Sequence, residues 1–279
     1  MVKRVLGLTV VIVLVGVASA HILTAGQAAS TNTAAPRGGQ GGAQPTDVSK
    51  MPLMNVTVVQ IKPDMVNDWM EFQKSETIPT LQKGGVKERT GIATVIGPSF
   101  EYVFLTPATN FAARDGDNPI VKALGEDGAR AYAQKNRRFI ASQRTYVVRV
   151  RTDLSYHSDA AAQLPIAVVS EYTIAPGRAP DFESYIKNDV TPAHKQLKTG
   201  GFGVYQGLFG GEGNTFVVAT LMRNFAELDT GPAITRAYGA AKAAAIQQKL
   251  AGFVTHLERT VSREVPELSF RPRTVSENR

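Results

Sequence analysis

The chain repeats itself, and this internal repeat constrains its fold more than any other feature of the sequence. A shift of 113 residues brings identical residues together at Val56, Ile61, Pro63, Asp68, Lys74, Pro79 and Gly97. From 110 to 156, a shift of 114 aligns 16 identical residues out of 47. Two copies of a long unit indicate a duplication, whereas a solenoid stacks more copies of a shorter unit. We therefore expect two similar halves.

Both copies predict the same order of secondary-structure elements. Runs rich in β-branched residues at 55–62 and 166–174 predict strands, and a proline follows each run. The next segments, 64–83 and 177–198, have apolar residues at helical spacing and end at glycine pairs. Two strands joined by a tight turn then precede a short helical piece (119–124 or 232–238), a main helix (127–143 or 241–255) and a last strand (145–152 or 259–265). The order β-α-β-β-α-β is that of the split ferredoxin-like unit.

The predicted fold class is therefore α+β, with two fused ferredoxin-like units at 54–158 and 165–270 and a tail at 271–279. An antiparallel sheet with two helices on one face leaves its other face uncovered. The sheet of the second copy is the nearest partner for that face. We expect neither half to be an independent domain.

A short motif in the second copy resembles the dimeric α/β-barrel superfamily. It runs from Ala175-Pro176-Gly177 through Phe182 and Tyr185 to Asp189-Val190-Thr191-Pro192. The nearest-looking members are antibiotic-biosynthesis-type monooxygenases and NIPSNAP-type proteins. The first copy departs from the motif, with Asp64 where the second has Gly177.

The resemblance covers about residues 55–270 and implies an intramolecular pseudo-dimer whose antiparallel sheets close into a barrel. It also implies pockets between each sheet and its helices. It does not fix an activity, because the superfamily includes cofactor-free oxygenases, haem-handling enzymes, isomerases and binding proteins.

His194 is a candidate catalytic residue because the repeat aligns it with Leu81. A histidine at an apolar position can serve as a pocket base or a haem ligand. The alternative is a helix residue at the edge of the core. This difference between the copies favours a site in the second copy.

Glu76 and Asp189 occupy equivalent positions, one turn after the aromatic residues Phe72 and Tyr185. On the apolar side of a helix, such a carboxylate would have a raised pKa and could act as a base. The alternative is a local role, because each lies three residues before a proline and could cap freed backbone amides.

Ligand-binding candidates come from the strands and from the single tryptophan. Arg149 and Arg263 recur on the last strand and would hold an anionic ligand if they face a sealed interior, or lie in solvent otherwise. Trp69 fits core packing better than a catalytic role. The remaining candidates for lining a pocket are Glu171, Tyr172, Tyr205 and Gln206.

Several site classes find no support in the sequence. The chain has no cysteine, which excludes thiolate ligands and nucleophiles, and no histidine pair has metal-ligand spacing. We therefore expect no protein-bound metal, and no cofactor unless the protein handles haem. The glycines near Phe202 follow a helix and enter a strand, the wrong order for a phosphate-binding loop. The net charge of +7 is spread along the chain, so nucleic acid is not an expected partner.

The N-terminus is typical of an exported protein. Lys3 and Arg4 precede an apolar run from 5 to 17, and Ala18-Ser19-Ala20 provides a small-x-small cleavage pattern. We expect residues 1–28 to be a signal peptide cleaved after Ala20, or, if uncleaved, a membrane tether. Residues 29–53 are poor in large apolar side chains and are expected to be a disordered linker to a periplasmic or secreted protein.

The combined expectation is an exported tandem α/β-barrel protein that binds a small apolar or aromatic molecule in its sheet–helix pockets. The alternative is a cofactor-independent monooxygenase or a haem-handling enzyme of the same fold. The sequence leaves open the ligand, the number of sites and the oligomeric state, although a monomeric pseudo-dimer fits the duplication.

Overall fold

The computed structural model describes residues 47–272, apart from residues 117, 160, 162 and 163. The predicted signal peptide, most of the predicted linker and most of the predicted tail lie outside the described residues. The last residues of the predicted linker are described. Val48–Lys50 form a 3₁₀ helix, Met51 is buried, and the first strand already begins at Leu53.

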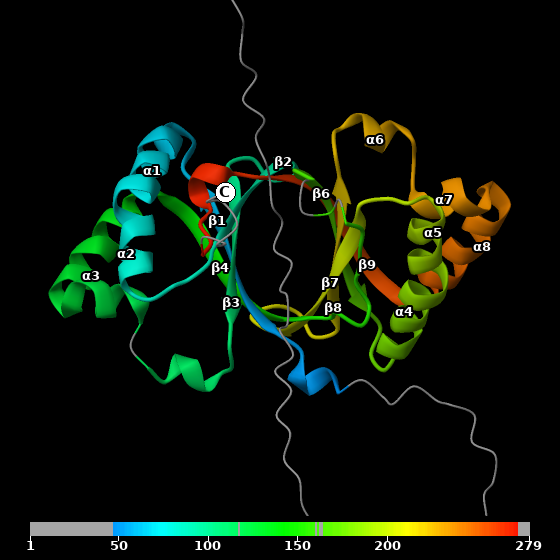
Figure 1. Cartoon of the computed structure of the whole chain (residues 1–279), viewed down its shortest axis with the longest axis horizontal. Coiled ribbons are helices and arrows are strands. Elements are labelled where there is room, and N and C mark those ends of the chain that lie inside the picture. The colour runs from blue at the N-terminus through cyan, green and yellow to red at the C-terminus, as the bar shows by residue number, and fades with distance from the viewer. Residues whose placement is uncertain (1–46, 117, 160, 162–163, 273–279) are drawn as a thin grey trace, which may run out of the picture.

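Eight antiparallel strands close into a barrel at the centre of the molecule, with helices on its two outer sides (Figure 1). The order around the barrel is β4-β1-β3-β2-β9-β6-β8-β7, and β7 pairs back onto β4. The strands are β1 (Leu53–Ile61), β2 (Thr90–Ile96), β3 (Glu101–Ala108), β4 (Ile140–Val150), β6 (Ile166–Ile174), β7 (Gly201–Phe209), β8 (Thr215–Met222) and β9 (Val254–Glu264). A two-residue strand, β5 (Tyr156–His157), pairs with the other edge of β7.

The two halves of the barrel have the same strand order. The first half reads β4-β1-β3-β2 and the second β9-β6-β8-β7, which is the ferredoxin-like arrangement in each case. The halves join where β2 pairs with β9 and where β4 pairs with β7. The predicted α+β fold with a closed antiparallel barrel is confirmed.

The helices cover the outer face of each sheet. They are α1 (Val66–Phe72), α2 (Ile78–Lys83), α3 (Pro119–Phe139), α4 (Ala179–Tyr185), α5 (Thr191–Gln196), α6 (Ala226–Asp229), α7 (Ala233–Tyr238) and α8 (Ala240–Ala251). A five-residue π-helix, Gln73–Thr77, joins α1 to α2, and its counterpart Ile186–Val190 joins α4 to α5. Each precedes a proline that cannot donate to the preceding turn, and the wider π turn accommodates that residue.

The boundary between the main helix and the last strand differs from the prediction in both halves. The helices end at Phe139 and Ala251, and the strands begin at Ile140 and Val254, about five residues earlier than predicted. Register explains the difference, because Ile140 pairs with the end of β1 and Val254 with the end of β6. Strand pairing outweighs the polar local sequence there.

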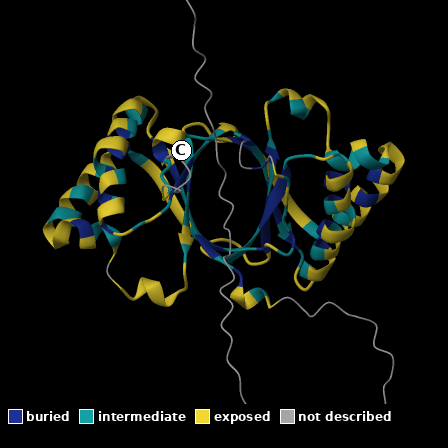
Figure 2. Cartoon of the chain, in the orientation of Figure 1, coloured by how far each residue is buried: buried dark blue, intermediate teal, exposed yellow. Residues whose placement is uncertain are grey.

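Each half has its own apolar core between sheet and helices, and each core is completed by a leucine from the other half. Leu154 follows β4 of the first half but packs, 1% exposed, in the second-half core. Leu268 follows β9 but packs, 0% exposed, in the first-half core beside Trp69 and Phe104. Exposed residues lie mainly on the outer faces of the helices (Figure 2).

None of the helices in the described part of the chain combines the length and the apolar character needed to cross a membrane.

Candidate functional site

The two halves differ most in the layer between sheet and helices of the first half. Five side chains there are polar where the second half has apolar ones. The pairs are Gln73 and Ile186, Thr77 and Val190, Arg89 and Phe202, Tyr132 and Ile246, and Asn136 and Leu250. We call Gln73, Thr77, Arg89, Tyr132 and Asn136 the first-half polar cluster.

The structure itself fixes these equivalences. The two π-helices, 73–77 and 186–190, match residue for residue. Gly125 and Gly239 both break a helix with positive φ, seven residues before Tyr132 and Ile246 respectively. On the strands, the N–H of Gly91 donates to Ser269 and the N–H of Val204 donates to Ser155, and each serine follows the last strand of the other half. Gly91 and Val204 are therefore equivalent, and so are Arg89 and Phe202, two residues before them.

Arg89 is the centre of the cluster. Its side chain is 4% exposed, its Nη2 donates to Gln73 Oε1 at 2.7 Å, and its guanidinium lies 3.6 Å from the centroid of the Phe104 ring. Within the described residues, no carboxylate pairs with Arg89, and its buried Nε has no hydrogen-bond partner. Burial lowers the pKa of Arg89 to about 10, yet it stays charged at neutral pH. A buried cation with a free donor is suited to bind an anion.

Two residues of α3 complete the cluster. The Tyr132 hydroxyl lies 2.9 Å from Thr77 Oγ1, and its ring stacks on Phe72 at 5.3 Å between centroids. Burial raises the pKa of Tyr132, so its phenol is neutral at pH 7. Asn136 Oδ1 is buried without a hydrogen-bond partner. The cluster therefore offers an unpaired acceptor as well as an unpaired donor.

A pocket leads from solvent to this cluster. It has a volume of about 650 Å³ and lies between α3 and the beginning of β4. Tyr132 and Asn136 belong both to its lining and to the cluster. Apolar residues supply much of the remaining wall, including Ile120, Val121, Ala129, Ala133 and Ile140. Such a lining suits a small, largely apolar molecule with a few polar groups.

His194 belongs to the second-half core. It is 5% exposed, its Nδ1 lies 2.7 Å from Thr199 Oγ1, and its ring meets the buried Phe202 ring edge-on at 4.9 Å. Burial, aided by the charge of Arg236, lowers the pKa of His194 to about 4. A ring packed in this way and already engaged through Nδ1 does not fit an axial haem ligand. The structure favours the core alternative for this residue.

Glu76 does not point into the sheet–helix layer, contrary to the first of the two interpretations of the helical spacing. The π-helices insert an extra residue into the turn, so Thr77 and Val190 are buried instead. Glu76 pairs with Lys135 at 3.0 Å on the outer side, and its side chain is 42% exposed. Asp189 is half-buried, and its backbone carbonyl accepts a hydrogen bond from the Tyr238 hydroxyl at 3.1 Å.

Arg149 and Arg263 lie on the outer face of the barrel, because their register partners share the face that packs on the helices. The guanidinium of Arg263 lies 5.2 Å from the centroid of the Phe225 ring. Trp69 is 1% exposed and packs 4.5 Å from Tyr102, centroid to centroid, as the core interpretation expects. These three residues do not join the first-half polar cluster.

The four predicted pocket-lining residues of the second half do not form one site. Tyr172 is buried in the second-half core, and Gln206 Oε1 accepts a hydrogen bond from Arg151 on the same face. Glu171 and Tyr205 alternate with them along β6 and β7 and therefore face the barrel interior.

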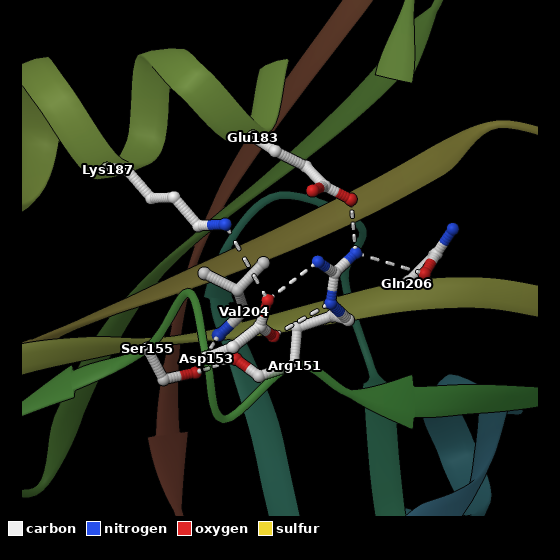
Figure 3. Close-up of polar contacts among 7 residues, drawn as sticks. All are labelled: Arg151, Asp153, Ser155, Glu183, Lys187, Val204 and Gln206. Carbon is white, nitrogen blue, oxygen red and sulfur yellow. Dashed lines mark hydrogen bonds and ion pairs between the residues drawn. The ribbon is translucent and has the colours of Figure 1, made fainter. Parts of the chain in front are cut away.

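Arg151, which the sequence did not single out, is the centre of an ion-pair network (Figure 3). Its Nε and Nη2 donate to the two Asp153 oxygens at 2.9 and 2.8 Å, and its Nη1 donates to Glu183 Oε1 at 2.6 Å. Burial acts to lower the pKa of Arg151, but the hydrogen bonds and charges of the two carboxylates raise it overall. The network ties the segment after β4 to α4 and β7, which is a structural role.

No group of three or more His, Asp or Glu side chains in the described ranges is placed to hold a metal ion.

Comparisons with solved structures are consistent with the barrel. The anthrone oxidase-like protein is 11% identical with a TM-score of 0.54, covering 78% of this chain and 93% of that chain. A monooxygenase candidate from Lactobacillus acidophilus NCFM is 8% identical with a TM-score of 0.50, covering 79% and 96%. A mutant chlorite dismutase from Candidatus Nitrospira defluvii is 8% identical with a TM-score of 0.48, covering 77% and 91%.

No family model matches the sequence, and no curated protein matches it. The likeness therefore concerns the fold. The strand order, the closed eight-stranded barrel and the outer helices agree with the resemblance found in the sequence. This chain has the fold of the dimeric α/β-barrel proteins, with both halves of the barrel supplied by one polypeptide.

Proposed function

We propose that the first-half polar cluster and its pocket form the active site of a cofactor-independent oxygenase whose substrate is a small aromatic molecule with a phenolic or enolic oxygen. The observation that carries this proposal is Arg89, a buried cation with an unpaired donor. It lies behind Tyr132, which lines the largely apolar pocket. The second half fills the equivalent space with Phe202.

The chemistry follows from the charge of the site. Arg89 would bind the deprotonated substrate oxygen and stabilise the anion, while Asn136 Oδ1 would accept a hydrogen bond from a second hydroxyl. Tyr132, which lines the pocket and stacks on the buried Phe72, offers a ring against which an aromatic substrate can lie. An electron-rich anion can react with O₂ directly. In the net reaction, a CH₂ group and O₂ give a C=O group and H₂O, so the substrate supplies all four electrons and both hydrogens that reduce O₂.

Two of the solved structures support this choice of reaction, because they are described as a monooxygenase candidate and as anthrone oxidase-like. Their fold accommodates such an activity, and their low identity leaves the substrate as part of our proposal. We also infer that the two halves arose by duplication. The first half then kept a polar site, and the second became an apolar support.

Oxygen uptake by the purified protein tests the proposal. The substrates would be anthrone and a panel of di- and trihydroxyarenes, with product analysis for the new carbonyl. Arg89→Met should lower kcat/KM by about a hundredfold, the loss expected when a charged transition-state donor is removed. Phe202→Met, at the equivalent position of the second half, is the matched control and should retain activity. Absence of uptake with the whole panel, or full activity of Arg89→Met, would overturn the proposal.

We further infer, from the N-terminal sequence, that the protein is exported and processed after Ala20. From the duplication, we infer that it acts as a monomeric pseudo-dimer. Fractionation of cells producing the full chain, followed by N-terminal sequencing and light scattering, tests this. A cytoplasmic protein that retains Met1, or a stable dimer, would contradict it.

A further inference from the structure

The strand register identifies the side chains that face the barrel interior. Alternate residues of each strand point inward, and they include Val56, Val58, Val103, Leu105, Val169 and Val217. All of these are partly accessible, whereas their outward-facing neighbours Val59, Phe104 and Phe216 are at most 8% exposed. If side chains filled the interior, these inward residues would be as buried as the outward ones. The interior is therefore an accessible, largely apolar space, as in eight-stranded barrels that hold a small ligand.

One end of this interior is closed. Met54, Val148 and Leu221 point inward near that end and are 5%, 7% and 5% exposed. Ala161 and Leu164, from the segment between the two halves, pack against Leu221 outside them. We call the opposite end, where β1 and β6 finish, the mouth.

The mouth carries two unpaired carboxylates side by side. Glu171 and Glu258 are direct cross-strand partners on β6 and β9 and face the interior. Within the described residues, neither has a basic nitrogen within the 4.0 Å of an ion pair. Like charges placed directly opposite each other repel, which destabilises the sheet. Burial, and then the charge of Glu258, raise the pKa of Glu171.

An aromatic ring lies among these carboxylates. Tyr146 is opposite Val56 and therefore faces the interior. Burial raises the pKa of Tyr146, the charge of Arg144 lowers it, and the charges of Glu171, Glu101 and Glu258 raise it. The guanidinium of Arg144 lies 5.3 Å from the centroid of the Tyr146 ring. Carboxylates beside an aromatic face are the groups that proteins use to recognise ammonium ions.

A second observation, independent of the charges, also indicates an occupant. Thr90 is opposite Leu105 and therefore points inward, and its side chain is 3% exposed. Its Oγ1 is buried without a hydrogen-bond partner. Buried hydroxyls are normally satisfied, so an unpaired one on the inward face is suited to bind a polar group of a ligand.

We propose that the barrel interior is a second binding site, separate from the first-half polar cluster, and that its ligand is an organic ammonium ion with a short apolar chain. The ammonium group lies between Glu171 and Glu258 at the mouth, near the Tyr146 ring. The chain extends along the valines of the interior toward Thr90, and a polar group at its far end would pair with the Thr90 hydroxyl. The carboxylates repel an anion of the same shape, which sets the specificity.

Calorimetric titration with octylammonium, and with octanoate as the anion of matched shape, tests the site. Octylammonium should bind and octanoate should not. Glu258→Gln should weaken binding by about tenfold, the usual effect of removing one charge partner, whereas Arg144→Gln should strengthen it by removing a competing cation. Glu267→Gln, which changes an exposed carboxylate outside the interior, is the matched control and should have no effect.

A further variant tests whether the chain enters the barrel. Ala219→Phe fills the interior from β8 and should abolish binding, and Val217→Phe is the alternative if that protein does not fold. Arg89→Met should leave octylammonium binding unchanged, which separates this site from the proposed oxygenase site. Equal binding of octanoate, no binding of octylammonium, or unchanged binding after the interior is filled would overturn the proposal.

Discussion

Replacing the buried Arg89–Gln73 pair by apolar residues should stabilise the protein while it abolishes activity. The perturbation is the double variant Gln73→Ile/Arg89→Met, which brings the first half close to the Ile186 and Phe202 of the second. Arg89 is 4% exposed, and burial lowers its pKa from 12.5 to about 10. A shift of that size corresponds to about 3 kcal/mol against the charged form in the folded state.

The sign of this effect is fixed across the useful pH range. Below about pH 10, Arg89 is protonated in the folded and the unfolded protein, so the full cost of burying the charge is present. The contact with Phe104 and the hydrogen bond to Gln73 offset part of it. Replacing both partners of a buried polar pair is often neutral or stabilising, and we expect a gain of about 1–3 kcal/mol.

Urea denaturation at neutral pH measures this gain as a higher midpoint at an unchanged slope. Arg89→Met alone should gain less, because it leaves Gln73 Oε1 buried without its donor. A loss of more than about 1 kcal/mol in the double variant, at an unchanged slope, would refute the reasoning. Arg89 would then be a structural residue, like Arg151. It would not be a residue that lowers stability in order to bind a ligand.

Three further predictions follow from other parts of the structure. Burial lowers the pKa of His194 from 6.5 to about 4, so the unfolded chain binds more protons than the folded protein between these values. The free energy of unfolding should therefore fall by about 2 kcal/mol from pH 7.5 to pH 5. His194→Leu should remove that part of the pH dependence in urea titrations. Leu154→Ala and Leu268→Ala should each cost about 2–5 kcal/mol and keep one cooperative calorimetric transition, and two separated transitions would contradict the shared cores. Asp153→Asn should lower the free energy of unfolding by about 3 kcal/mol, because it leaves the buried Arg151 partly unpaired, and added salt should change this loss little. Asp181→Asn, which breaks an exposed ion pair, should change stability by less than about 1 kcal/mol.

The repeat made the fold predictable from the sequence. Two copies of a β-α-β-β-α-β pattern, each with one uncovered sheet face, led to a barrel, and the structure has this strand order. Local patterns were less informative where long-range pairing decides the outcome. The polar residues after Ile140 resemble the end of a helix, and only their pairing with β1 makes them part of a strand. The exchange of Leu154 and Leu268 between the cores depends on the closed barrel and has no local signal.

The candidate site was less predictable, for two reasons. The alignment of the repeats is loose between Pro79 and Gly97, so Arg89 could not be paired with Phe202 from the sequence alone. The π-helices also rotate the helix faces, which buries Thr77 rather than Glu76. A position-by-position comparison of polarity would still have identified Tyr132 and Asn136, which align with Ile246 and Leu250 at the shift of 114.

The closed barrel explains how one half can keep a polar core. An isolated ferredoxin-like unit with Arg89, Gln73 and Asn136 under its helices would lose much of the apolar burial that stabilises it. Here its sheet continues through β2–β9 and β4–β7 into a half whose core is apolar, and Leu268 from that half fills the space beside Trp69. We expect the two halves to unfold together, so stability gained in the second half supports the first. A fused pair can therefore assign binding to one half and stability to the other, which two identical subunits of a homodimer cannot do.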